Sequence, residues 1–113
     1  MSLIALLALP AAAQQNRVDF MGQVHPILAQ KCFACHGGDK RSGGLSVQEY
    51  DDVLKGGRSG PAVIPGDSKQ SLIVLRVTGA HAPQMPLAGP KLTPEEVATL
   101  RLWIDQGARA TQT

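Results

Sequence analysis

Apolar residues recur at helical spacing in four segments of the chain, and no stretch alternates between apolar and polar positions as a strand would. The first predicted helix runs from about Asp19 to Cys32, with Asp19 as its N-cap and a kink at Pro26. Its apolar positions are Phe20, Val24, Ile27 and Leu28. The pattern predicts an all-α chain of about four helices.

Two further helices are predicted in the middle of the chain. Ser46-Val47-Gln48-Glu49 has the form of a capping box, and the helix it opens should stop at Gly56-Gly57. Asp67-Ser68-Lys69-Gln70 is a second predicted helix start, leading into an apolar run over Leu72 to Val77. Gly79 should end that helix.

The last predicted helix has the strongest local signals. Thr93 is the expected N-cap, Pro94 takes the first helical position, and Glu96 completes a capping box. Gly107 should end the helix. Its apolar positions are Val97, Leu100, Trp103 and Ile104. The segment before it, Gly79 to Pro94, contains four prolines and should form a stiff, non-helical loop.

The first 13 residues are predicted to be a signal peptide rather than part of the fold. Leu3 to Leu9 is apolar, Pro10 interrupts it, and Ala11-Ala12-Ala13 offers a cleavage site before Gln14. The run is too short to span a bilayer. No Lys or Arg precedes it, so either the start is trimmed or the free amino group is the only positive charge. Residues 14–113 then form a single exported domain, periplasmic if bacterial.

Composition excludes several classes of partner. The 113 residues carry a net charge of +2, with no basic stripe and no basic amphipathic helix. Neither nucleic-acid binding nor membrane binding is therefore predicted. No stable membrane span is expected in the mature chain either. Only 4% of the residues are aromatic, so a large apolar cofactor would add usefully to a small core.

Both cysteines of the chain lie in the segment Cys32-Phe33-Ala34-Cys35-His36. C-x-x-C-H is the spacing of covalent haem attachment, in which each thiol joins one vinyl group and the adjacent histidine ligates iron. A thioredoxin-like dithiol would require a βαβ pattern, which is not visible. A structural zinc site would require a second ligand pair, and His25 and His81 are isolated.

A second axial iron ligand could come from Met21, His25, His81 or Met85. Met85 is favoured because it lies between Gln84 and Pro86 in the stiff loop, and a thioether favours ferrous iron and raises the potential. His81 is the main competitor, and an open site is the third possibility. Met21 is expected to pack in the core and His25 to lie at the surface.

Several segments together resemble the planctomycete-type cytochrome c domain, a small class I-like c-type cytochrome. They are Val24 to Leu28, Cys32 to Gly37, Gly43-Gly44-Leu45, Ser59 to Gly66, Ser71-Leu72, Met85-Pro86, Leu92 to Glu96 and Leu102 to Ala108. The resemblance implies the cytochrome c fold, with N- and C-terminal helices crossing on one side of a single haem. It also implies one covalent haem c on Cys32 and Cys35, with iron held by His36 and Met85.

Other residues have candidate roles around such a haem. In many c-type cytochromes the carbonyl of a Gly-Pro loop accepts a bond from the proximal histidine, and Gly60-Pro61 could do so here, the alternative being an ordinary turn. Arg58 and Arg76 could pair with a propionate, although most such arginines are solvated. Residues that could steer an acidic redox partner are Lys31, Lys40 and Arg41.

These observations predict a one-electron carrier rather than an enzyme, acting as a monomer or as the electron-accepting subunit of a complex. Its partners would be redox proteins such as a dehydrogenase, an oxidase or another cytochrome. Two alternatives stay open: a haem-based sensor or haem enzyme with an exchangeable distal ligand, and a non-haem C-x-x-C redox or metal module.

Overall fold

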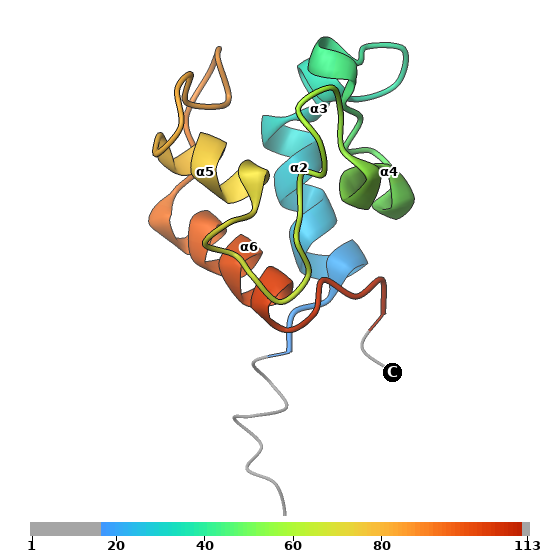
Figure 1. The fold of residues 1–113 in the computed structure, drawn as a ribbon, viewed down its shortest axis with the longest axis vertical. Coiled ribbons are helices and arrows are strands. Elements are labelled where there is room, and N and C mark those ends of the chain that lie inside the picture. The colour runs from blue at the N-terminus through green and yellow to red at the C-terminus, as the bar shows by residue number, and fades with distance from the viewer. Residues whose placement is uncertain (1–16, 112–113) are drawn as a thin grey trace, which may run out of the picture.

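The computed structural model describes residues 17–111, and within this range the chain is helical, with no strand and only an isolated bridge between Gly57 and Gly60 (Figure 1). This confirms the all-α prediction for the described residues. The predicted signal peptide, residues 1–13, lies outside them. The elements in chain order are η1 (Phe20–Val24), α2 (His25–Lys31), α3 (Phe33–His36), η2 (Ser42–Gly44), α4 (Tyr50–Lys55), α5 (Leu72–Thr78) and α6 (Pro94–Asp105).

The first helical segment begins at the predicted cap and changes geometry before Pro26. The Asp19 carboxylate accepts a hydrogen bond from the Gly22 N–H at 2.5 Å. η1 is a π-helical turn in which the His25 N–H bonds to Phe20 O, five residues back. Pro26 then falls in the first turn of α2, where a missing N–H costs nothing. The expected irregularity at Pro26 is thus a π turn that leads directly into an α-helix.

The predicted capping box at Ser46 and Glu49 is wrong. α4 starts at Tyr50, and its N-cap residue Glu49 makes no side-chain capping bond. Ser46 and Val47 lie buried in the preceding loop. The Val47 N–H donates to His36 O at 2.7 Å, which fixes this segment as an extended crossing over α3 rather than a helical turn.

The helix start predicted at Asp67–Gln70 is a turn, and α5 begins only after Ser71. Ser68 is held elsewhere, because its N–H and hydroxyl both donate to the Asp105 carboxylate, at 2.9 and 3.0 Å. That contact ties the turn to the last residue of α6. Gly79 ends α5 in the left-handed conformation, as predicted, with φ 83°.

The last helix matches the sequence prediction. Thr93 Oγ1 accepts from the Glu96 N–H at 3.1 Å, Glu96 Oε1 accepts from the Thr93 N–H at 2.9 Å, and Pro94 is the first helical residue. Along α6, Leu100, Trp103 and Ile104 are buried. The helix therefore has a defined start and one buried face.

An aromatic cluster joins the two ends of the described chain. The Phe20 ring lies 5.3 Å from the Trp103 ring and 5.4 Å from the Tyr50 ring, measured between centroids. The Tyr50 hydroxyl donates to Ala108 O at 2.7 Å, and Trp103 Nε1 donates to Arg109 O at 2.9 Å. η1 consequently packs against α6, as in the crossing of terminal helices that the resemblance implies.

Among residues 17–111, none of the helices has both the length and the apolar character needed to cross a lipid bilayer.

Candidate functional site

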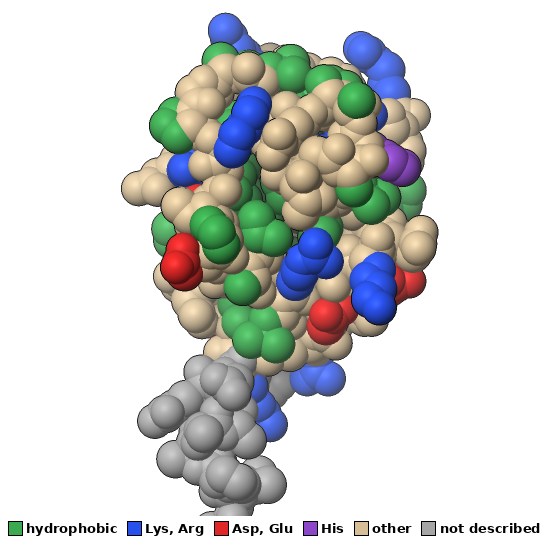
Figure 2. Space-filling model, turned by 90° about the vertical axis from the view of Figure 1, so that its left-hand side faces the viewer, with side chains coloured by type: hydrophobic (Ala, Val, Ile, Leu, Met, Phe, Trp, Pro, Cys, Tyr) green, Lys and Arg blue, Asp and Glu red, His purple; other side chains and the backbone are tan. Residues whose placement is uncertain are grey.

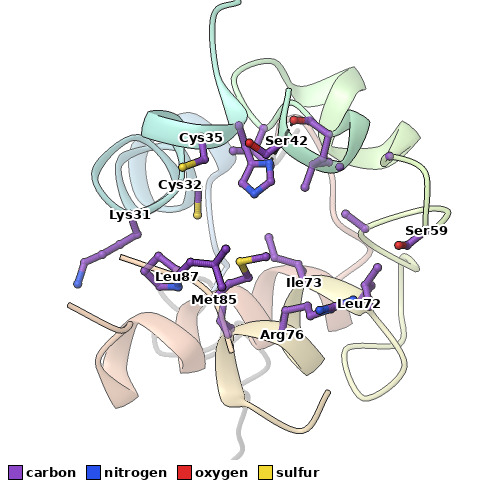
Figure 3. A pocket seen from close by; sticks show the side chains of 18 of the residues that line it. Lys31, Cys32, Cys35, Ser42, Ser59, Leu72, Ile73, Arg76, Met85 and Leu87 are labelled. Carbon is purple, nitrogen blue, oxygen red and sulfur yellow. Dashed lines mark hydrogen bonds between the residues drawn. The ribbon is translucent and has the colours of Figure 1, made fainter. Parts of the chain in front are cut away.

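A cavity of about 400 Å³ lies between the α2–α3 segment on one side and α5 with its following loop on the other. Figure 3 shows the sulfur atoms of Cys32 and Cys35 on one side of this space and that of Met85 on the other. Pockets for small molecules and cofactors have volumes of about 300 to 1,000 Å³. Apolar residues that line the wall include Leu45, Val47, Ala62, Leu72, Ile73, Val77 and Leu87.

The two cysteines reach the cavity from the junction of α2 and α3. Cys32 leaves helical geometry with φ −126°, ending α2, and Cys35 follows one short turn later in α3. Both are free thiols, Cys32 half-buried and Cys35 exposed. Burial raises the pKa of Cys32 to about 11, and the nearby Glu96 carboxylate adds to that effect. The environment of Cys32 therefore favours the neutral form of its sulfur over the thiolate.

His36 lines the cavity and has a defined tautomer. Its Nδ1 atom lies 3.3 Å from Leu45 O. Because a carbonyl oxygen can only accept, Nδ1 must carry the proton, which leaves the lone pair of Nε2 available to a metal. Of the two roles open to Gly60-Pro61, the structure has the ordinary turn: Gly60 O accepts from the Gly57 N–H at 3.2 Å, and the carbonyl opposite His36 Nδ1 is that of Leu45.

The four candidates for a second iron ligand occupy very different places. Met85 lines the cavity, whereas His81 is exposed and stands outside the lining. Met21, expected in the core, is 61% exposed, because η1 buries Phe20 and Val24 instead.

His25, expected at the surface, is only partly exposed. Its ring meets the edges of Phe20 and Phe33, with centroids 5.9 and 5.3 Å away. Its Nε2 lies 3.1 Å from Gln48 O. These contacts tie α2 to the loop before α4 and place His25 outside the cavity lining.

Two parts of the wall were missed by sequence reasoning. One is the apolar face of α5, where Leu72, Ile73 and Val77 line the cavity beside Arg76, which the sequence had already made a candidate partner of a propionate. The spacing of these four residues at i, i+1, i+4 and i+5 is a signal that could have identified this face. The Leu45 carbonyl opposite His36 had no such signal, because every residue carries a backbone oxygen.

Residues 32–90, just over half of the 113, match a protein family described as Planctomycete cytochrome C. The chain belongs to this family. The matched segment contains both cysteines, His36 and Met85. No curated protein and no solved structure shows a significant match to the cytochrome.

Membership in the family indicates a c-type cytochrome with covalent haem c and iron, an electron-transfer protein rather than an enzyme, of a kind that is typically exported. The cavity fits a haem c, since it is apolar and has the two thiols and an imidazole on its wall. Within residues 17–111 no group of three or more His, Cys, Asp or Glu side chains could hold a metal ion. Haem iron needs no such group, because the porphyrin supplies four nitrogen ligands.

Lys31 stands at the rim of the cavity and is already engaged. Its Nζ lies 3.3 Å from Glu96 Oε1 and donates to Lys91 O at 3.1 Å. Lys31 thus links α2 to the start of α6.

On the face that carries α5 and the loop after it, Figure 2 shows Lys and Arg side chains standing apart, with hydrophobic side chains between them.

Glu96 should make the stability of the cytochrome depend on pH. The hydrogen bond from the Thr93 N–H lowers the pKa of Glu96 most, partial burial opposes this, and the Lys31 ammonium lowers it further. Because the pKa is lower in the folded chain, this stabilisation is present above the usual carboxyl pKa of about 4.3 and is lost as the pH falls through the folded value. At pH 7 the native protein should exceed Glu96→Gln in unfolding free energy by up to about 1 kcal/mol.

Urea denaturation at several pH values would measure the difference. Glutamine can still accept the capping bond, so the comparison isolates the charge. The two proteins should converge as the pH falls through the lowered pKa that Glu96 has in the folded protein. Glu95→Gln, in the same helical turn, is the matched control and should change less. A difference for Glu96→Gln that persists in acid would contradict the assignment.

Proposed function

We propose that this protein is a monohaem one-electron carrier, with haem joined to Cys32 and Cys35 and iron held by His36 and Met85 inside a cytochrome c fold. The observation that carries the proposal is that the C-x-x-C-H motif and Met85 meet on the walls of one apolar cavity (Figure 3). When bound, haem iron supplies a reversible one-electron couple.

The residues of the chain would set the properties of that couple. His36 offers a neutral imidazole whose orientation the Leu45 carbonyl fixes. Met85 offers a soft, uncharged thioether, which favours ferrous iron and a high potential. The apolar lining disfavours the extra positive charge of ferric iron, so it should raise the reduction potential as well. Both ligands come from hydrogen-bonded segments, so little rearrangement should accompany electron transfer.

The setting of this function is also part of the proposal. Family members are typically exported, which supports a periplasmic location for the cytochrome. Its partners would be other redox proteins, with the cytochrome acting as a monomer or as the electron-accepting subunit of a complex. The exposed Leu87, at 66%, lies on the cavity wall and would leave an apolar edge for such encounters.

Export in a bacterial host competent for cytochrome maturation tests the proposal. The intact mass of the native protein should equal the polypeptide plus one haem, and the haem should stay attached on denaturation. Cys32→Ala and Cys35→Ala should each retain at most one thioether, and the double variant should lose covalent haem. The mass of the bare polypeptide for native protein would overturn the proposal. Carbon monoxide binding to the reduced native protein would favour an open distal site, as in a sensor or enzyme.

A further inference from the structure

The loop that carries Met85 forms hydrogen bonds with the carbonyl groups at the C-terminal end of α5. The last four carbonyls of a helix have no partner within it. Two of these carbonyls in α5 accept backbone bonds from the loop: Leu75 O from the His81 N–H at 3.0 Å, and Arg76 O from the Met85 N–H at 2.8 Å. The backbone of Met85 is therefore part of the cap of α5.

Two side chains add to this cap. Gln84 Nε2 donates to Val77 O, another terminal carbonyl of α5, at 3.1 Å. In the opposite direction, the Arg76 guanidinium reaches out of the helix and donates to Ala82 O at 2.9 Å. The loop is thus pinned by side chains before Met85 as well as by its own backbone.

Of these two side-chain hydrogen bonds, the one from Arg76 to Ala82 O is the stronger. Its donor is charged, and charge-assisted hydrogen bonds are roughly twice as strong as neutral ones. The Arg76 side chain is partly buried and lines the cavity beside Met85 (Figure 3). Loss of this contact would loosen the loop at Ala82 while leaving the backbone bond of Met85 to α5 and the contacts of Lys91 Nζ with Gln84 O and Pro86 O in place.

We propose that Arg76, through its bond to the Ala82 carbonyl, is a positioning residue that keeps Met85 at the iron against competing ligands. The inference rests on the proposed function, in which Met85 is the distal ligand. It assigns to Arg76 a mechanical role in the loop, distinct from service as a counter-ion to a haem propionate.

The test uses the exported, haem-loaded protein and imidazole as the competing ligand. In Arg76→Met, which keeps an unbranched apolar stem, imidazole should bind the oxidised protein about fivefold to tenfold more tightly than in the native protein. The sulfur-to-iron charge-transfer band should weaken in parallel. Arg58→Met is the matched control, since it removes the same charge from another part of the chain. The backbone N–H of Arg58 bonds to Gly43 O, and Arg58 is not part of the loop that carries Met85.

Two more variants keep the test decisive if Arg76→Met does not accumulate. Arg76→Lys retains a charged donor and should restore most of the native imidazole affinity. Gln84→Met should shift that affinity in the same direction as Arg76→Met by a smaller factor, because a neutral bond is lost.

The outcomes separate the two proposals. A lower reduction potential in Arg76→Met with unchanged imidazole affinity and band intensity would mean a counter-ion role and overturn this inference alone. An equal effect of Arg58→Met would overturn it as well. A native protein whose spectrum does not depend on Met85 would remove both this inference and the assigned distal ligand.

Discussion

Met85→Ala should abolish the sulfur-to-iron charge-transfer band of the oxidised cytochrome and lower its reduction potential by about 100 mV or more. Axial ligands span a range of roughly 0.8 V in haem proteins, and a thioether lies on the high-potential side of it. Alanine leaves either water or an external ligand at the iron, both of which favour the ferric state more than sulfur does. Visible spectra and a spectroelectrochemical titration would measure the two effects.

His81→Ala is the matched control for this experiment. His81 lies in the same loop but is exposed and outside the cavity lining, so the band and the potential should stay near native values. Its backbone bond to Leu75 O does not depend on the side chain. If only His81→Ala changed the spectrum, bis-histidine ligation would replace the proposed coordination.

Gly56→Ala should destabilise the protein by about 3 kcal/mol or more. Gly56 has φ 78° and ψ −162°, a conformation that residues with a side chain rarely adopt. An added Cβ would also lie 2.1 Å from Gly60 O and 2.6 Å from Pro61 Cα, both backbone atoms that cannot rotate away. Strain and overpacking would therefore act together.

Gly66→Ala separates these two causes. Gly66 has a similar φ of 87°, but nothing lies within 4 Å of its added Cβ. Gly66→Ala should therefore lower the free energy of unfolding by the conformational strain alone, about 1 kcal/mol. Urea unfolding followed by Trp103 fluorescence would compare the variants. Equal losses for Gly56→Ala and Gly66→Ala would show that the close approach to Gly60 is unimportant.

The Gly56 variant should also affect the site. Gly60 and Ala62 belong to the cavity wall, and the segment between them would have to move away from α4 to make room for the Cβ. The cavity should then hold the cofactor less well, which a lower yield of haem-loaded protein would reveal. Gly66 is not part of that wall and should leave the yield unchanged.

Local signals predicted some of the helix boundaries of this protein and failed at others. The Thr93 and Glu96 capping box is formed as expected, because both of its bonds lie within one turn. The same sequence logic failed at Ser46–Glu49 and Asp67–Gln70, where long-range bonds took the backbone away from the helix. Capping propensities are worth about 1 kcal/mol, so tertiary contacts can override them.

By itself the sequence predicted the attachment chemistry, because two thiols and an imidazole within five residues need no distant partner to be recognised. It also reduced the second iron ligand to four candidates. Only the tertiary structure put Met85 on the cavity wall, left Met21 and His81 exposed, and supplied the Leu45 carbonyl to His36. Those relations join segments far apart in the chain or use backbone atoms that all residues share, so no local pattern can encode them.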